Sequence, residues 1–228
     1  MKLELIVPTS LDEIPLRSYQ EFKKIYDQNP EDNEFLSEKM IQIFCGIELK
    51  DVIKIKASDL TDMIQHFNKL FEYKPKFKQT FKIGDMEFGF VPNLENISWG
   101  EYVDAEKYMS SWDTMHKAMA VLYRPITKRK GEKYEIAEYT GASEFSDLMK
   151  LTPVSIAMSC SVFFWTLGLE LLECLGDYLE KETKKMRTST ANQHNSESNG
   201  DGISQSMRYL KETFLDSMKL QDNPYINV

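Results

Sequence analysis

The sequence contains none of the motifs that identify common enzymes. It has no glycine-rich phosphate loop of the GxGxxG or GxxxxGK[ST] type, no GxSxG nucleophile motif and no HExxH zinc motif. Its three histidines, His66, His116 and His194, are isolated, and no motif places a cysteine or an aspartate beside them. We therefore expect no enzymatic activity, no catalytic residue, no bound cofactor and no metal site.

The sequence also has few cysteines and fewer basic than acidic residues. The three cysteines, Cys45, Cys160 and Cys174, are widely spaced, which argues against a disulfide framework and favours a reducing compartment. Lysine and arginine total 28 against 36 aspartates and glutamates, so the net charge is −8. Because a dedicated duplex-DNA binder normally has a basic balance, we expect no sequence-specific nucleic-acid partner, and only a local basic patch stays open.

One uncharged stretch, residues 153–169, has to be tested as a membrane span. It lies at the lower limit of about 17–25 residues for crossing a bilayer. Four hydroxyl side chains dilute its apolarity, and Glu170 and Glu173 follow at once. We expect a buried core helix here and no contact with a membrane. The side chains expected to be largely buried in it are Phe163, Phe164, Trp165, Leu167 and Leu171.

Helical spacing dominates the N-terminal third of the chain. Apolar residues recur at intervals of three and four along residues 15–28, 31–45 and 59–72, which predicts three amphipathic helices. The first follows a capping-box spacing that starts at Ser10. The second ends at Gly46, a residue type common just past a helix C-terminus.

Two later segments have the features of β-hairpins. Residues 77–91 form two strand-like runs around a Gly84-Asp85 turn, which predicts a hairpin. A second hairpin is predicted within residues 126–139, around a charged tip at 128–131. The first hairpin carries four phenylalanines, which we interpret as core residues. They are Phe77, Phe81, Phe88 and Phe90.

Four further helices complete the predicted domain. A capping box at Ser98-Trp99-Gly100-Glu101 opens a helix that we expect to end near Met109. The others are expected at residues 113–123, 143–150 and 153–185. The predicted fold class is α+β and mostly helical: a helical bundle with one or two β-hairpins and a C-terminal arm.

The acidic and basic clusters are interpreted as surface features. Glu101, Asp104 and Glu106 fit a solvated first helical turn that the helix dipole stabilises, better than a metal or acid–base site. Two basic runs lie at the predicted hairpins, and either is a solvated strand or turn, or a contact with phosphate or an acidic subunit. We expect the tip at Lys128, Arg129 and Lys130 to contact a partner subunit. The basic residues of both runs are Lys74, Lys76, Lys78, Lys82, Lys128, Arg129, Lys130 and Lys133.

The C-terminal part divides into a linker and an arm. Residues 187–206 are mostly Ser, Asn, Thr, Gly and Gln, with too little apolar surface to offset the entropy of ordering. We predict a globular, mainly helical domain over residues 1–186, a polar linker over 187–206 and a docking arm over 207–228. A short apolar stripe in the arm suits a helix that folds on binding to another subunit. A flexible tail and a helix packed on its own domain are the alternatives. The expected partner-binding residues of the arm are Leu210, Phe214, Pro224, Tyr225 and Ile226.

Two stretches carry a resemblance to known proteins. They are FGFVPNLENISWGEYVD, residues 88–104, and MHKAMAVLYRPI, residues 115–126. Both are similar to sequences in a group of proteins encoded by tailed bacteriophages, including crAss-like phages, and the resemblance covers residues 30–180. Genes of this group typically lie among virion and tail genes, and the resemblance supplies no catalytic residues.

The resemblance implies a structural role in a virion. Head-to-tail ring and adaptor proteins are small, mostly helical domains with projecting hairpins and a terminal arm, and they form rings under the portal. We expect a ring or adaptor subunit of the connector or tail, in a homo-oligomeric ring beside portal or tail proteins. Its location would be the virion, after synthesis in the bacterial host cytoplasm. The alternatives are a tail assembly chaperone absent from the mature virion, and an enzyme or nucleic-acid regulator with an unfamiliar site.

Overall fold

The structure, a computed structural model, describes residues 5–93, 97–164 and 166. The chain divides into two units, and the first of them, up to Cys160, contains nearly all of the described residues. The predicted linker and arm lie outside the described residues, and so do all five of the expected partner-binding residues of the arm. These five residues are Leu210, Phe214, Pro224, Tyr225 and Ile226.

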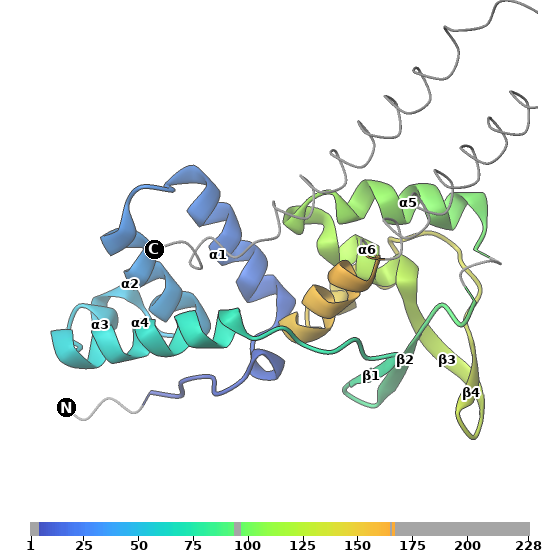
Figure 1. Ribbon diagram of the computed structural model, residues 1–228, viewed down its shortest axis with the longest axis horizontal. Helices are drawn as coiled ribbons and strands as arrows, with labels where there is room; N and C mark the ends of the chain where they lie inside the picture. Colours follow the sequence, from blue (N-terminus) through green and yellow to red (C-terminus); the bar gives the residue numbers. More distant parts are fainter. Residues whose placement is uncertain (1–4, 94–96, 165, 167–228) are drawn as a thin grey trace, which may run out of the picture. The chain divides into compact units, whose positions relative to one another are not determined.

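The first part of the unit is helical, as the spacing predicts (Figure 1). A 3-10 turn, η1 (Leu11–Glu13), precedes α1 (Leu16–Gln28), α2 (Asn33–Phe44) and α4 (Ala57–Glu72), which are the three predicted helices. A fourth short helix, α3 (Leu49–Val52), was not predicted. The helices share an aromatic core, in which the ring of Phe44 lies 5.5 Å from that of Phe67 and 5.4 Å from that of Phe71.

A four-stranded antiparallel sheet follows, and it contains both predicted hairpins. Its strands are β1 (Thr80–Ile83), β2 (Met86–Phe90), β3 (Tyr123–Lys130) and β4 (Lys133–Ile136), in the order β1-β2-β3-β4. Each hairpin turns at a glycine with positive φ, +57° at Gly84 and +62° at Gly131, a conformation that glycine adopts without strain. The mixed, mostly helical α+β prediction is therefore confirmed.

Three more helices pack beside the sheet. They are α5 (Trp99–Met109), α6 (Met115–Leu122), which a 3-10 turn η3 (Trp112–Thr114) precedes, and α7 (Ser146–Met149). Both α5 and α7 contact α6, and six of the side chains of α6 are buried. The helix predicted over 113–123 gives way to strand β3 at Tyr123. There the chain turns because the Tyr123 side chain is fully buried and its hydroxyl donates to the Lys78 carbonyl at 2.6 Å.

The N-terminal helices are tied to the rest of the unit at the start of α1. The backbone N–H of Leu16 donates to the carbonyl of Thr152 at 2.8 Å, and that of Val154 donates to the carbonyl of Ile14 at 2.8 Å. All four residues are almost fully buried. Because these bonds join segments far apart in the sequence, they fix η1 beside the helix that begins after Pro153.

The helix after Pro153 is described as far as residue 166 and was predicted to be a core helix. Its first turns are buried at Val154, Ile156 and Cys160. Phe163 and Phe164, which were expected to be largely buried, are half-buried. The other three side chains expected to be buried, Trp165, Leu167 and Leu171, lie outside the described residues.

Candidate interaction surface

The link between α4 and β1 presents a row of lysines to solvent. Along residues 74–78, exposed lysines alternate with half-buried Pro75 and Phe77, and the ring of Phe77 lies 4.9 Å from that of Phe90. Backbone contacts hold the link in this register, since Phe90 donates its N–H to the Gln79 carbonyl at 2.8 Å. The exposed side of the link therefore carries Lys74, Lys76 and Lys78.

Two hollows flank this link, and Lys78 lines both. The larger, which we call the basic cleft, has a volume of about 590 Å³ and lies between η1, the end of α4, the link and the helix after Pro153. Its lining includes Lys69, Lys76 and Lys78, and its apolar wall is formed largely by Leu70, Tyr73 and Pro75. The smaller hollow, of about 380 Å³, lies between the link and the β3–β4 hairpin, and Arg129 and Tyr134 line it.

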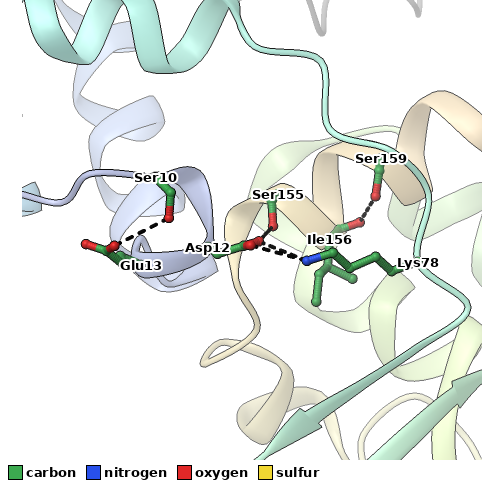
Figure 2. Close-up of polar contacts among 7 residues, drawn as sticks. All are labelled: Ser10, Asp12, Glu13, Lys78, Ser155, Ile156 and Ser159. Atoms are coloured by element: carbon green, nitrogen blue, oxygen red, sulfur yellow. Dashed lines mark hydrogen bonds and ion pairs between the residues drawn. The ribbon is translucent and has the colours of Figure 1, made fainter.

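A polar cluster forms one side of the basic cleft (Figure 2). The Asp12 carboxylate accepts a short hydrogen bond from the Ser155 hydroxyl and lies 3.2 Å from the Lys78 ammonium. The Ser155 hydrogen bond and then the Lys78 charge outweigh partial burial and hold the pKa of Asp12 below its ordinary value. Both members of the Asp12–Lys78 pair are about half exposed, at 53% and 50%, so the pair contributes no more than about 1 kcal/mol.

The predicted capping box at Ser10 has a different geometry from the one expected. The Glu13 carboxylate accepts from the backbone N–H of Thr9 at 3.0 Å, one residue earlier than a capping box requires. The Ser10 side chain makes no cap hydrogen bond, and the turn that follows is a 3-10 turn. The α-helix begins only at Leu16, because Pro15 favours the position just before or at a helix start.

The three predicted residues of the hairpin tip differ in their surroundings. Lys128 pairs with Glu135 across the hairpin at 2.9 Å, and Arg129 pairs with Glu87 on β2 at 2.9 Å. The hydrogen bond to Glu135 raises the pKa of Lys128. Lys130 is exposed, and its ammonium forms no ion pair with any other residue that the structure describes. Thus the tip offers one unpaired cation of the three predicted.

The acidic set on α5 is not a solvated helical turn, so that interpretation is wrong for Glu101. This carboxylate completes the capping box by accepting from the Ser98 N–H at 2.7 Å, and it lies 2.6 Å from the Arg124 guanidinium. Each member of the pair is only 9% exposed. Burial alone would raise the pKa of Glu101, but the hydrogen bonds from Ser98 and the charge of Arg124 hold it below its ordinary value.

An exposed apolar stripe on α5 was not recognised in the sequence. Trp99 is 78% exposed, and Tyr102 and Val103 are about 40% exposed, at positions one turn apart on the same face. The rings of Trp99 and Tyr102 stack with centroids 5.8 Å apart. The opposite face holds Ala105 and Met109, both buried, so the spacing of apolar residues on two faces was the signal for this stripe.

The histidines and cysteines described have structural surroundings. His66 Nε2 lies 2.8 Å from the Pro8 carbonyl, and His116 Nδ1 lies 3.0 Å from the Gln20 amide. Burial raises the pKa of the Cys160 thiol and raises that of Cys45 to about 11, which leaves both thiols protonated near neutral pH. Within residues 5–93, 97–164 and 166, no group of three or more His, Cys, Asp or Glu side chains is placed to hold a metal ion.

In the part of the chain that the structure describes, no helix combines the length and apolarity needed to cross a bilayer. Comparisons of the chain with protein-family models, with curated proteins and with solved structures found no match. The two hollows, the hairpin tip and the α5 stripe are therefore the features of the molecule that bear on its function.

Proposed function

We propose that this chain is a structural component of a tailed-phage virion, a ring or adaptor subunit of the head-to-tail connector or tail. The observation that carries the proposal is the way in which the two resembling stretches combine. Residues 88–104 supply the end of β2 and the first half of α5, and residues 115–126 supply α6 and the start of β3. They meet in the β2–β3 ladder and in the buried Glu101–Arg124 pair. The resemblance therefore falls on one folded element, not on two unrelated segments.

The β3–β4 hairpin supports a role in assembly. The first two residues of β3 are buried, but residues 127–130 and the turn are exposed, so the hairpin projects beyond the sheet (Figure 1). At its end Lys130 lies opposite Lys133. Like charges directly opposite one another weaken a strand pair, so stability of the hairpin does not explain this arrangement. A carboxylate from a neighbouring subunit would offset the repulsion.

The proposed partners follow from the same features. Lys128, Arg129 and Lys130 contact a second copy in a homo-oligomeric ring or a neighbouring portal or tail protein. The predicted arm contributes Leu210, Phe214, Pro224, Tyr225 and Ile226 to the same assembly. The proposal includes no catalytic step, no sequence-specific nucleic acid and no membrane. The proposed location is the virion, after synthesis in the host cytoplasm.

One observation favours the second candidate, a tail assembly chaperone that is absent from the mature virion. A chaperone needs an exposed apolar surface for its client, and the stripe of Trp99, Tyr102 and Val103 on α5 is such a surface. A ring subunit would cover the same stripe permanently with a neighbouring protein.

Quantitative mass spectrometry of purified particles from a phage that encodes this chain separates the two candidates. We expect a fixed, ring-like number of copies per particle, measured relative to the major capsid protein. Abundance in infected cells together with absence from purified particles would favour the chaperone. Absence from particles, combined with no effect of gene deletion on particle formation, would contradict both candidates and favour an enzyme or a regulator.

A further inference from the structure

We propose that the basic cleft receives the turn between α1 and α2 of a second copy of this chain. We call that turn, residues 27–34, the acidic turn. The inference rests on the proposed ring function, because it names the two surfaces through which neighbouring subunits would meet. It uses described residues of the first unit alone, and it does not involve the arm.

The basic cleft has an excess of positive charge that the residues described by the structure do not neutralise. Lys69 and Lys76 are exposed, and neither ammonium forms an ion pair with a residue that the structure describes. Lys78 has a single, half-exposed partner, Asp12. Three ammonium groups therefore face one carboxylate, in a chain whose net charge is −8. This excess suits an acidic occupant.

The acidic turn carries the opposite excess. Residues 27–34 hold four carboxylates and no lysine or arginine, and all four are exposed. Asp27 pairs with Lys23, and Asp32 accepts the Phe35 N–H at 3.1 Å as the N-cap of α2. The carboxylates of Glu31 and Glu34 form no hydrogen bond or ion pair with the residues described, so they are available to a partner.

The shapes of the two surfaces also correspond. The acidic turn is a short connection between two helices with the exposed Pro30 near its middle. The basic cleft is an open hollow of about 590 Å³ whose wall includes Leu70, Tyr73 and Pro75. An exposed proline with carboxylates on either side therefore matches an apolar wall with lysines around it.

A single copy cannot make this contact with itself. The cleft lies beside η1, just before α1 begins, whereas the acidic turn lies at the opposite end of α1 (Figure 1). With 13 residues at about 1.5 Å per residue, α1 separates the two by roughly 20 Å. The contact is therefore between copies and head-to-tail. Such contacts generate a ring when the rotation between subunits closes.

Charge reversal on one surface at a time tests the inference in the full chain. One variant, Glu31→Lys/Glu34→Lys, alters the acidic turn, and the other, Lys69→Glu/Lys76→Glu, alters the basic cleft. By sedimentation velocity over a concentration series, we expect each variant alone to self-associate at least tenfold more weakly than the wild type. An equimolar mixture should assemble again, because the surfaces left intact in the two variants match one another, and so do the two reversed surfaces. A chain with all four reversals should assemble again.

Matched controls exclude a general effect of charge. Glu106→Lys/Glu138→Lys and Lys50→Glu/Lys56→Glu change the net charge by the same amounts at exposed positions outside both surfaces. Both controls should assemble as the wild type does. Far-ultraviolet circular dichroism and thermal melts of every variant should match the wild type, so that lost assembly is not lost folding.

Several results would overturn the inference. They are a wild type that stays monomeric at all concentrations, variants that associate like the wild type, or a mixture that does not associate. If cleft reversal alone blocks incorporation into particles while reversal of the acidic turn does not, the occupant is an acidic partner protein, and the second-copy assignment is wrong. Stoichiometric presence in particles with normally assembling variants would reject this contact and keep the proposed function. Charge-dependent assembly of a chain that is absent from particles would support this contact and reject the proposed ring function.

Discussion

Glu101 has two structural roles, one within its own helix and one toward the sheet, and only the first could be seen in the sequence. Its carboxylate closes the capping box at the start of α5, and it neutralises Arg124 from β3 in a site where both side chains are only 9% exposed. A buried ion pair adds little net stability compared with apolar residues, but removal of one partner leaves an uncompensated charge. Glu101 is therefore the residue at which α5 and the sheet depend on one another.

Glu101→Gln should lower the free energy of unfolding by about 3 kcal/mol, the lower end of the range for a broken buried pair. Glutamine still serves in a capping box, so the substitution isolates the loss of charge beside Arg124. Urea denaturation measures the effect. The exposed Glu106 on the same helix provides the control, and Glu106→Gln should change stability by less than about 0.5 kcal/mol. Equal effects of the two substitutions would contradict the assignment.

The same residue predicts a pH dependence. Because the folded-state pKa of Glu101 lies below its ordinary value, its contribution to stability is present above the unfolded-state pKa of about 4.3. That contribution is lost as the pH falls through the folded-state pKa. Between pH 5 and the acid transition, the wild type should therefore lose stability more steeply than Glu101→Gln. Parallel stability curves for the two proteins would contradict this prediction.

Strand β2 contains a glycine that the sheet requires. A Cβ atom at Gly89 would lie 2.4 Å from the Tyr134 ring, and Tyr134 is held in place because its hydroxyl donates to the Phe90 carbonyl at 2.8 Å. Gly89→Ala should destabilise the unit by about 1–3 kcal/mol through overpacking, as measured by thermal or urea denaturation. Gly100 on α5 has open space around its Cβ position, so Gly100→Ala should be neutral or slightly stabilising. A neutral Gly89→Ala would show that Tyr134 moves aside freely.

The β3–β4 hairpin permits a comparison between two of its lysines. Lys130→Glu should weaken assembly more than Lys128→Glu, because Lys128 already has Glu135 as a partner and Lys130 has no described one. At 1 M salt, charges are screened beyond about 3 Å, so the difference in assembly between each variant and the wild type should become smaller. Analytical ultracentrifugation at two salt concentrations measures this. Unchanged assembly of Lys130→Glu, with loss of DNA retention in particles, would mean that the partner is DNA.

The elements that sequence reasoning located correctly are those with local causes. The Ser98 capping box, the Gly84 turn and the Gly46 helix end each depend on a few neighbouring residues, and all three are present. The start of β3 at Tyr123 was missed, since the second hairpin was expected only from residue 126. It depends on Tyr123, whose burial and hydrogen bond to Lys78 involve a distant segment. The Glu101 pairing was missed for the same reason.

The candidate interaction surface also has a part that could be predicted from the sequence and a part that could not. The exposed lysines of residues 74–78 and of the hairpin tip could be predicted, because charge clusters are visible in the sequence. The basic cleft could not, since it is formed where η1, the end of α4 and the helix after Pro153 meet. Nor could the pairing of Lys128 and Arg129 with Glu135 and Glu87 be inferred before the strand register was known.

The whole molecule combines a described unit, which has its own core and its own candidate contacts, with a C-terminal segment predicted from composition alone. The buried residues described run from Pro8 to Ser161 and include aromatic clusters on both the helices and the sheet. Deletion of residues 207–228 should therefore leave this core intact and shift the thermal midpoint by less than about 2 °C, equivalent to less than ~1 kcal/mol. The same deletion should block assembly, because a tethered arm raises the effective concentration of its contact in a ring of identical subunits. A shortened chain that assembles normally would remove the arm from the proposal, and one that unfolds would show that the segment belongs to the core.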